Sequence, residues 1–334
     1  MLRSAHGIYT MLINPIWLAL PIAVLMDRYL GEPTRWHPLV GFGRAAQGLE
    51  RRLNTSLNPP HRSIATGALA WLIMVGAVVT AIHVGKALLP MPSWLMDALA
   101  LWLALGGKSL QQHVSAVVRP LQQQDLTTAR WALSRIVSRD TAALDEQGIA
   151  RATIETTLEN GADAIFASLF WFMVGMPLGL AAELVLMHRA VNTLDAMWGY
   201  KNSRFLTFGR IAARSDDLIN WLPARLTALS YALVGHTRSA LNCWSRQASA
   251  WDSPNAGVVM ASGAGALQVQ LGGAAQYDGH TEIRPDLGCG SPANPDQIIA
   301  AQRLIQHSLQ LWLGLIGLTF LLTHWSIMTG GRSS

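Results

Sequence analysis

The sequence predicts an all-α, polytopic integral membrane protein, with several transmembrane or re-entrant helices and polar loops that form an active site beside the membrane. Of the 334 residues, 51% are hydrophobic and only 13% are charged, whereas a typical soluble domain is about 25% charged. Several apolar runs approach the length that a bilayer requires. No segment alternates polar and apolar residues over a useful length, so strands are not expected, and residues 1–334 are taken as one membrane-embedded domain.

Two runs predict full membrane spans. Residues 64–85 carry no formal charge, and a helix rising about 1.5 Å per residue over that run crosses a hydrocarbon layer of about 30 Å. Residues 308–328 form a second run, with Trp312 and Trp325 near its ends, where indole rings favour the membrane interface. Residues 11–26 predict an uncleaved N-terminal anchor, because no small-residue cleavage site follows them.

Further apolar segments are short or interrupted. Residues 90–105 are a candidate span that contains Asp97, and a crossing there would put the basic loops on both sides of it in the cytoplasm. Residues 164–187 are predicted to be broken or re-entrant, because two glycines and a proline at 175–179 leave two halves too short to span alone. Residues 217–235 suit an interfacial or bundle-lining helix. Residues 252–297, rich in Gly, Pro, Asn and Asp, predict one long loop.

Composition excludes several classes of protein. The net charge of +5 is spread over the loops without a dense basic stripe, which favours membrane orientation and excludes a nucleic-acid partner. Cys243 and Cys289 lie far apart in the sequence and have no metal-ligand spacing. Neither a disulfide framework nor a zinc site is therefore expected, and both thiols are predicted to be inert.

Charged residues recur every four positions just before the interrupted segment. Arg151, Glu155, Glu159 and Asp163 would form one stripe along a helix. Arg151 and Glu155 suit an ordinary surface pair, but the three acids repel one another unless a cation or donor lies among them. A solvated helix face is the alternative, although the stripe runs directly into an apolar segment.

A second polar cluster follows the interrupted segment. Asn192 and Asp195 share a helix face, and Lys201 and Asn202 follow Gly199 in the next turn. Carboxylate and amide groups at this spacing suit Mg²⁺ or a metal-bound phosphate, with the lysine as counter-charge. The alternative is a helix C-terminus with Gly199 at the position after the cap.

Three weaker signals complete the list of candidate sites. Asp216 and Asp217 are adjacent and point to different sides of a helix, where one of them suits an N-terminal dipole partner. Residues 253–257 read as a turn followed by glycines, without the ending of a Walker loop. The His37-Pro38 turn is unspecific by itself.

Together these segments resemble one family, the adenosylcobinamide-phosphate synthases, which are membrane enzymes that attach an aminopropanol arm to cobyric acid. The resemblance covers nearly the whole chain, with departures at Ser138, Ala164 and Ser168. It rests on Asp27 with LGEP at 30–33 and HP at 37–38, SRIVSRDT at 134–141, ETTLEN at 155–160, AVNTLD at 190–195, GYKN at 199–202, DDLINWLPAR at 216–225, SPNAG at 253–257, GAL at 265–267 and LGG at 271–273.

The resemblance implies ATP- and Mg²⁺-dependent amide formation between adenosylcobyric acid and aminopropanol or its O-phosphate. It implies an inner-membrane protein in contact with the lipid bilayer, with its active site on the cytoplasmic side. Other cobalamin-pathway enzymes are possible partners. The implied catalytic residues are Glu155, Glu159, Asp195 and Asp217. The implied substrate-binding residues are Arg139, Asp140, Asn160, Asn192, Lys201, Asn202, Arg225, Ser253, Asn255 and His37. Asp163, Asp195 and Asp216 are the hypothetical Mg²⁺ ligands, and Arg139, Lys201, Arg204 and Arg225 are the candidate phosphate partners.

Two other functions fit the pattern of charges beside broken apolar segments. A polytopic transporter or channel is the first, although the inverted repeats typical of many transporters are absent from the sequence. A non-catalytic scaffold that presents corrinoid intermediates to other enzymes is the second, and it is suggested by the departures from the family pattern.

Overall fold

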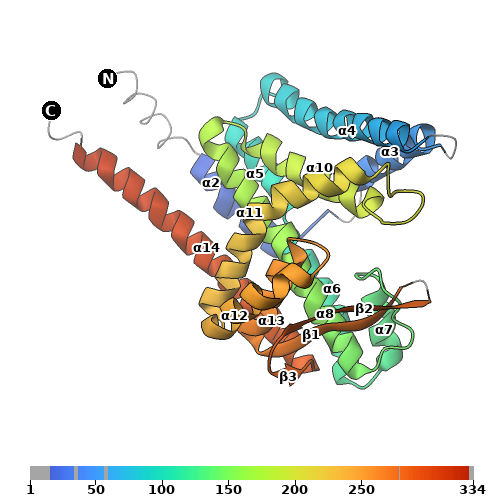
Figure 1. Cartoon of the computed structure of the whole chain (residues 1–334). Helices are drawn as coiled ribbons and strands as arrows, with labels where there is room; N and C mark the ends of the chain where they lie inside the picture. Colours follow the sequence, from blue (N-terminus) through green and yellow to red (C-terminus); the bar gives the residue numbers. More distant parts are fainter. Residues whose placement is uncertain (1–15, 34–36, 56–58, 278, 331–334) are drawn as a thin grey trace. The chain divides into compact units, whose positions relative to one another are not determined.

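The computed structural model describes residues 16–33, 37–55, 59–277 and 279–330, and most of them are helical (Figure 1). The α-helices are α2 (Ile16–Tyr29), α3 (Pro38–Leu53), α4 (Pro60–Leu88), α5 (Ser93–Ala104), α6 (Gly107–Gln122), α7 (Leu126–Ser134), α8 (Glu146–Gly161), α9 (Ser168–Gly175), α10 (Ala181–Trp198), α11 (Arg210–Val234), α12 (Thr237–Gln247), α13 (Ala256–Leu267) and α14 (Pro295–Gly330). A π-helix (Ala162–Ala167) joins α8 to α9, and short 3₁₀ turns cover Met176–Leu178 and Ala248–Ala250. The strands are β1 (Val269–Tyr277), β2 (His280–Gly288) and β3 (Ser291–Pro292).

The chain divides into two compact units where the sequence predicts one domain. The first unit contains the described residues up to Gly106, those of Ser168–Ile219 and those from Leu313 onward. The second unit contains Gly107–Ala167 and the described part of Asn220–Trp312. Each unit therefore combines segments that are far apart in the sequence, which residue spacing alone does not reveal.

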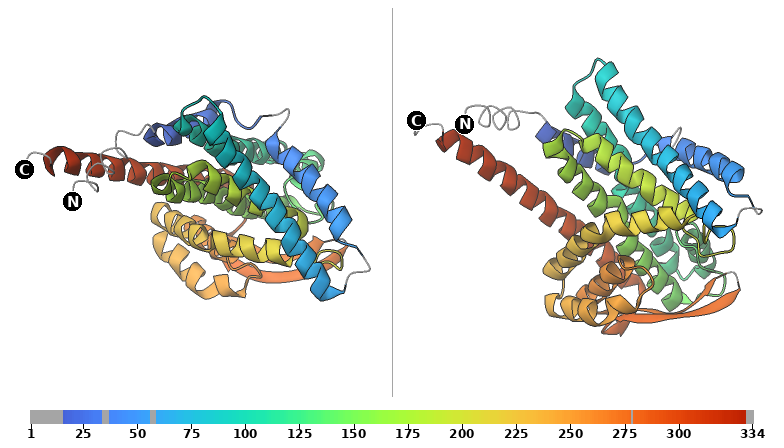
Figure 2. Two further views of the ribbon diagram at one scale, coloured as in Figure 1. Left: turned by 90° about the horizontal axis from the view of Figure 1, so that it is seen from above. Right: turned by 45° about the horizontal axis from the view of Figure 1, so that its top comes forward.

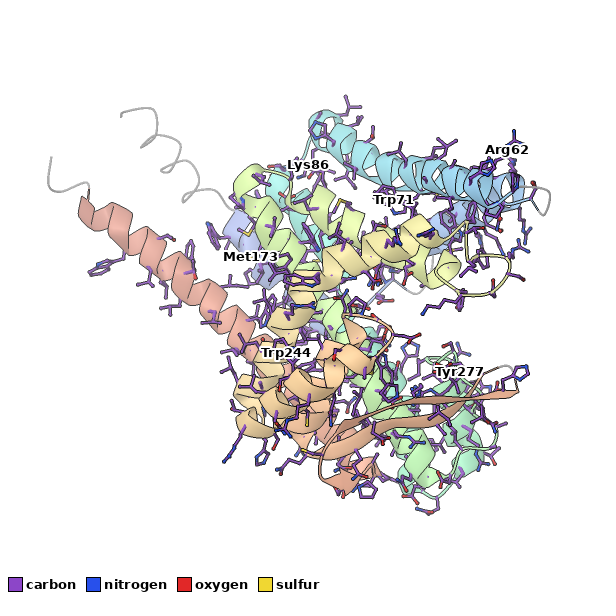
Figure 3. All side chains as sticks on the ribbon, viewed as in Figure 1. Arg62, Trp71, Lys86, Met173, Trp244 and Tyr277 are labelled. Carbon is purple, nitrogen blue, oxygen red and sulfur yellow. The ribbon has the colours of Figure 1, made fainter. Side chains whose placement is uncertain are left out.

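Among the described residues, three helices are long and apolar enough to cross a membrane: Pro60–Leu88, Glu146–Leu178 and Pro295–Thr323. The first contains the run 64–85, and the third contains most of the run 308–328. Arg62 and Lys86 lie near opposite ends of α4, as the labels in Figure 3 show, so the charged residues of this helix flank its apolar middle. The chain is an all-α polytopic membrane protein.

Two of the shorter predicted segments differ from expectation. Helix α5 has 12 residues, so at about 1.5 Å per residue it is too short to cross the hydrocarbon layer alone. The N-terminal anchor lies partly outside the described residues, and its described part is α2, with 14 residues. Neither element is therefore a span by its own length over the described residues.

The interruption at residues 175–179 occurs where the sequence places it. The helix ends in a 3₁₀ turn, Met176–Leu178, and Gly179 adopts the left-handed conformation with φ 70° before α10 begins. The expectation that both halves are short is wrong for the first half. That half continues back through the π-helix into α8, and the whole helical run Glu146–Leu178 has 33 residues.

Residues 252–297 are not a loop, and this is the main correction to the predicted fold. They contain α13 and a hairpin in which β1 pairs antiparallel with β2, while β3 pairs parallel with β1. Tyr277 pairs with His280, so only two residues separate the strands, and Gly279, the second of them, has a positive φ of 78°, as short hairpin connections favour. A register irregularity between Leu271 and Gly273 breaks the alternation along β1. Helix α13 is buried along almost its whole length and shows no polar face.

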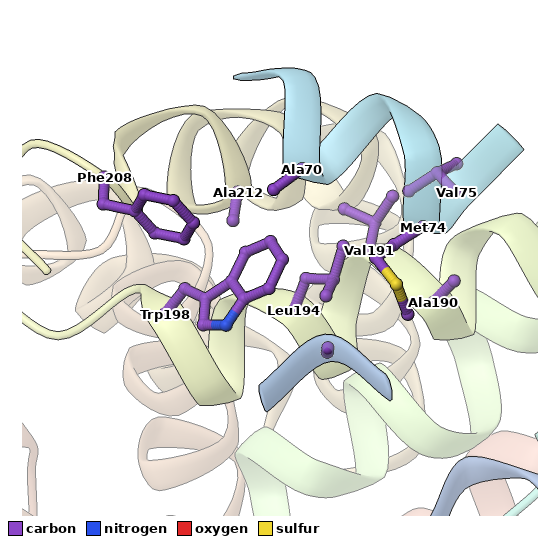
Figure 4. Close-up of a cluster of buried hydrophobic side chains, with 10 residues drawn as sticks. Ala70, Met74, Val75, Ala190, Val191, Leu194, Trp198, Phe208 and Ala212 are labelled. Atoms are coloured by element: carbon purple, nitrogen blue, oxygen red, sulfur yellow. The ribbon is translucent and has the colours of Figure 1, made fainter. Parts of the chain in front are cut away.

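The core of the first unit joins α3, α4, α10 and the start of α11. Trp198 and Phe208 meet edge to face, with ring centroids 5.2 Å apart, among small side chains such as Ala70 and Ala212 (Figure 4). Helix α4 lies along α10, as both views in Figure 2 show. Gly67 permits this packing, because a Cβ atom there would lie 2.0 Å from the Phe208 carbonyl oxygen.

The second unit packs around α8. The Tyr231 hydroxyl donates a hydrogen bond to the Leu158 carbonyl oxygen over 3.1 Å, and the Phe166 ring contacts both Tyr231 and Trp312. Strand β1 lies on α8. This packing places the buried face of α8 against the hairpin and determines which carboxylates of the predicted stripe are accessible.

Candidate active site

A buried triad of charges fixes the hairpin to α8 in the second unit. The Glu155 side chain is 2% exposed and forms ion pairs with Arg139 and with Arg284, whose Nη1 lies 3.1 Å from Glu155 Oε2. The Gly272 N–H donates to Glu155 Oε1 over 2.7 Å. We call Arg139, Glu155 and Arg284 the closed triad. Because three donor groups already occupy both oxygens, Glu155 has the surroundings of a structural anchor and not of an accessible base.

The predicted surface pair between Arg151 and Glu155 is absent from the structure. Arg151 instead reaches the Ala274 carbonyl oxygen over 3.5 Å. Asp140 also supports the hairpin, because its Oδ2 accepts from the Gly279 N–H over 2.9 Å, and its own N–H donates to the Gln276 carbonyl oxygen. Asp140 and the triad member Arg139, both predicted to bind substrate, therefore make contacts that hold the hairpin.

The remaining residues of the acidic stripe lie in different surroundings from Glu155. Glu159 and Asn160 are exposed, and the Asn160 amide donates to the Thr156 carbonyl and hydroxyl oxygens over 3.0 and 2.7 Å. Asp163 lies in the π-helix, where the helical phase changes. The four charged residues therefore do not form one continuous face.

Another predicted set meets at the start of α13. Arg225 stacks on the Trp221 ring, with its guanidinium carbon 4.1 Å from the ring centroid, and Nη1 lies 3.3 Å from Asn255 Oδ1. The Ser253 hydroxyl accepts from the N–H groups of Asn255 and Ala256 over 3.4 and 3.3 Å. The structure thus brings Arg225 and Asn255 together, while Ser253 stabilises the turn that precedes α13.

The first unit gathers a second group of charged and polar residues from α10, α11 and the segment between them. Asn192 Nδ2 lies 3.4 Å from Asp216 Oδ1, and Lys201 interacts electrostatically with Asp217. Asp195 lies one helical turn after Asn192. We call Asn192, Asp195, Lys201, Asp216 and Asp217 the open cluster. None of its members is buried, so a ligand has access to them.

Burial and charge act in opposite directions on Asp217. Partial burial raises the pKa of its carboxyl, and the charge of Lys201 lowers it to a smaller extent. The net result is a pKa above the ordinary range for aspartate, which brings the carboxylate closer to what a general base at neutral pH requires.

Gly199 serves the open cluster and is not a left-handed helix cap. Its φ is −74°, which any residue adopts. A Cβ atom at Gly199 would lie 2.0 Å from Asp195 Oδ1. The missing side chain therefore leaves space for the Asp195 carboxylate. The predicted helix C-terminus is also confirmed, because α10 ends at Trp198 and the Gly199 N–H donates to the Asp195 carbonyl oxygen over 2.7 Å, which makes Gly199 the cap itself and not the residue after it.

Two predicted binding residues stabilise local turns in the first unit. His37 Nδ1 accepts from the Leu39 N–H over 3.2 Å at the start of α3. Asn202 Oδ1 accepts from the N–H groups of Arg204 and Phe205 over 3.1 and 3.0 Å. These contacts account for both residue types as caps of local structure.

Glu50 is a residue that the sequence does not mark as functional. Its side chain is 3% exposed and accepts from Arg204 Nε and Nη2 over 3.0 and 2.8 Å. This hydrogen bonding, followed by the charge of Glu50, raises the pKa of the Arg204 guanidinium. Glu50 follows Ala46 by four residues, so the two side chains share one face of α3. The structure shows that this face is the buried one.

Another buried group that residue spacing does not reveal lies at the end of α4. Lys86 Nζ is 2.7 Å from Asp97 Oδ1 and 2.7 Å from Glu183 Oε2, and Asp97 Oδ1 also accepts from the Ala182 N–H over 2.9 Å. These bonds join α4, α5 and α10. They explain how α5 carries a carboxylate inside an otherwise apolar helix, because a buried charge requires a partner.

The two cysteines are neighbours in the second unit despite their separation in the sequence. Both are free thiols. Burial, followed by a hydrogen bond with Cys289, raises the pKa of the Cys243 thiol to about 12. A thiol with so high a pKa is a poor nucleophile at neutral pH.

No three His, Cys, Asp or Glu side chains among the described residues converge to hold a metal ion. Of the three hypothetical Mg²⁺ ligands, Asp195 and Asp216 belong to the open cluster of the first unit. Asp163, the third predicted ligand, belongs to the second unit.

Sequence comparisons place the chain in a family. The sequence model of the CobD/Cbib protein family matches residues 20–305. The cobalamin biosynthesis protein CobD of Chromobacterium violaceum is 50% identical over 301 residues, covering 89% of this chain and 95% of that protein. CobD of Mycobacterium tuberculosis is 40% identical over 299 residues, covering 85% and 90%. No solved structure matches the chain. In agreement with the motifs, the chain belongs to the CobD/Cbib family.

Proposed function

We propose that this protein acts in cobalamin biosynthesis and joins the propionate carboxylate of adenosylcobyric acid to the amine of aminopropanol or its O-phosphate, with ATP as the energy source. Family membership supports the pathway, because the related proteins carry the name cobalamin biosynthesis protein. The observation that carries the reaction is the open cluster, which combines accessible carboxylates, a lysine and an aspartate whose pKa is raised. The transporter alternative draws no support from these relatives.

The residues of the open cluster suit the steps of this reaction. ATP with Mg²⁺ converts the substrate carboxylate into an activated acyl group that an amine is able to attack. Asp195 and Asp216 would hold the metal, and Lys201 would neutralise phosphate charge. Asp217 would accept the proton that the attacking ammonium must lose, because its raised pKa makes it a stronger base than an ordinary aspartate. The phosphate or nucleotide then leaves as the amide bond forms.

The test is a direct assay of the reaction. Membranes that contain the protein are incubated with adenosylcobyric acid, ATP, Mg²⁺ and either aminopropanol or its O-phosphate, and the corrinoid and nucleotide products are identified. We expect an adenosylcobinamide product with stoichiometric ATP consumption, and ADP or AMP distinguishes acyl-phosphate from acyl-adenylate activation. Corrinoid binding without turnover of either amine would favour the scaffold function.

We also propose that the protein resides in the inner membrane with both charged regions facing the cytoplasm, where ATP is available. Basic residues such as Arg51, Arg52 and Arg62 near the start of α4 support this orientation. Single cysteines at Ser138 and Ser203, both exposed, would be introduced after Cys243 and Cys289 are replaced by serine. We expect an impermeant thiol reagent to label both only after the cells are opened, and labelling of intact cells would contradict the orientation.

A further inference from the structure

A cavity of about 350 Å³ lies in the first unit. Helix α3 contributes Gln47, Glu50 and Arg51, α10 contributes Met197 and Trp198, and the following segment contributes Arg204 and Phe205. The open cluster takes Asp195 and Lys201 from the same helix and segment. The cavity and the residues that we propose for activation therefore draw on the same helix and the same following segment.

The cavity has a charged side and an apolar side. Arg51 and Arg204 supply two positive charges, while Glu50 supplies one negative charge, so the lining favours an anion. Met197, Trp198 and Phe205 form the apolar side. The cavity size is at the lower end of the range for small-molecule sites, about 300–1,000 Å³. A short chain that ends in an anionic group matches both sides.

Glu50 holds the Arg204 guanidinium in a fixed orientation. Arg204 Nε and Nη2 both donate to Glu50, and Asn54 Nδ2 donates to Glu50 Oε1 over 2.8 Å while also donating to the Arg204 carbonyl oxygen over 3.0 Å. Within the described part of the chain, no hydrogen bond engages Arg204 Nη1. A guanidinium that is oriented in advance loses less entropy when it binds an oxyanion.

We propose that this cavity binds a terminal phosphate group of a small substrate, with Arg204 and Arg51 as its charged partners and Glu50 as the positioning residue. The inference rests on the proposed function and adds to it the place where a phosphate is recognised. Two substrates could supply that group, namely the O-phosphate of the amine and the terminal phosphate of ATP. Kinetic constants for each substrate distinguish these sources.

The kinetic experiment compares Arg204→Gln and Arg51→Gln with the wild-type chain. Arg52→Gln is the matched control, because Arg52 is exposed, follows Arg51 on α3 and does not line the cavity. A charge-assisted hydrogen bond is worth about 1.5–3 kcal/mol, which corresponds to a rise in KM of about 10- to 10²-fold. We expect that rise for aminopropanol phosphate if it supplies the group, or for ATP if the nucleotide does, while the KM for unphosphorylated aminopropanol stays unchanged.

Direct binding separates this inference from the proposed reaction. Aminopropanol phosphate, inorganic phosphate and ATP are titrated calorimetrically into the detergent-solubilised full chain. We expect binding of a phosphate compound by the wild-type chain and by Arg52→Gln, with affinity reduced at least about tenfold in Arg204→Gln and Arg51→Gln. If the wild-type chain binds in this way but has no turnover, the proposed reaction fails and the phosphate site stands.

Glu50→Gln tests positioning by preserving size and removing the negative charge. We expect weaker binding of the phosphate compound and unchanged binding of aminopropanol, a difference that a general loss of structure would not produce. Arg51→Gln keeps the test decisive if a change at the buried pair prevents folding, because its side chain is exposed. Phosphate affinity unchanged in Arg51→Gln and in any folded Arg204→Gln, or absent from the wild-type chain, would overturn the proposal.

Discussion

The closed triad and the open cluster contain similar residue types and differ in how their charges are satisfied. In the triad, two arginines and a backbone N–H surround a carboxylate that is 2% exposed. In the open cluster the carboxylates remain accessible, and the Asn192–Asp216 contact is long, at 3.4 Å. In the sequence, Arg139 and Glu155 of the triad look as plausible as active-site residues as the members of the open cluster do. Glu155 is buried, whereas the carboxylates of the open cluster are only partly buried.

The difference shows why a charged motif does not by itself identify catalytic residues. A buried carboxylate with several donors stabilises one arrangement of the chain, and removing one partner leaves an uncompensated charge. An accessible carboxylate whose pKa is raised is poorly stabilised in the protein and gains from interaction with a ligand or a proton. The first kind of residue should affect stability, and the second kind should affect turnover.

The largest expected effect is a loss of protein stability when the closed triad is broken. Glu155→Gln leaves Arg139 and Arg284 without their counter-charge, and breaking a buried pair in this way costs about 3–5 kcal/mol. We expect a corresponding fall in the free energy of unfolding, measured by chemical denaturation in detergent. Glu159→Gln is the control one turn along α8. Because Glu159 is exposed, its stability should change by less than about 0.5 kcal/mol, and equal losses in the two variants would remove the distinction.

Glu159→Gln also tests whether Glu159 takes part in catalysis. If Glu159 belongs to the catalytic residues, turnover is lost while the protein accumulates normally in the membrane. Turnover equal to that of the wild type would assign Glu159 to a solvated helix face.

The open cluster should respond in the opposite way. Asp195→Asn keeps the size of the side chain and removes its charge, so we expect turnover to fall at least about 10²-fold, the scale of one lost transition-state contact. The melting temperature should stay unchanged. Cobyric acid binding, measured by absorbance titration, should also stay unchanged. Asp296→Asn, an exposed carboxylate in the first turn of α14, is the control. Loss of corrinoid binding in step with turnover would show that the cluster binds the corrin instead.

Gly199→Ala sharpens the comparison without removing a charge. The added methyl group would displace the Asp195 carboxylate, and we expect turnover to fall about tenfold, because small displacements of catalytic groups are costly. Alanine is compatible with the φ of −74°, but its methyl group would also lie 2.7 Å from the Asp195 carbonyl oxygen, so we expect a fall in the melting temperature as well. Gly48→Ala on α3 is the control, since a Cβ atom there meets nothing within 4 Å. Unchanged turnover would remove Gly199 from the site.

The smallest expected effect is a shift in pH dependence. Because Asp217 must be deprotonated to act as a base, turnover should rise with pH through its raised pKa, above the ordinary value of about 3.9. Lys201→Met removes the charge that lowers this pKa. The acid limb of the pH profile, which is the range where turnover rises with pH, should therefore move to higher pH, even if the maximum rate also falls. Asp217→Asn should abolish the limb, and an unmoved limb in Lys201→Met would exclude Asp217 as its source.

The raised pKa of Asp217 also predicts how the stability of the folded protein depends on pH. A carboxyl with a raised folded-state pKa prefers to be neutral in the folded protein, so its contribution to stability declines as pH rises from the unfolded pKa through the folded pKa. Asp217→Asn removes this decline. The measurement is the melting temperature of both proteins between acid and neutral pH.

The hairpin is the part of the fold that sequence patterns do not predict, although one signal was available. Asp278-Gly279 is a strong two-residue turn sequence. The register irregularity in β1 hides the alternation, and the burial of α13 removes the polar face that usually marks a helix. Arg284 was missed for the same reason, because its role requires that the hairpin fold back on α8.

Sequence patterns were sufficient for the membrane class, the interruption at residues 175–179 and the polar cluster that follows this interruption. These features depend on the length of apolar runs and on residue types near one another in the chain, so local spacing is sufficient to predict them. Tertiary structure alone decided which carboxylates are satisfied. Glu155 meets Arg284 across 129 residues and Glu50 meets Arg204 across 154, because burial and ion pairing depend on contacts between segments that only the folded chain brings together.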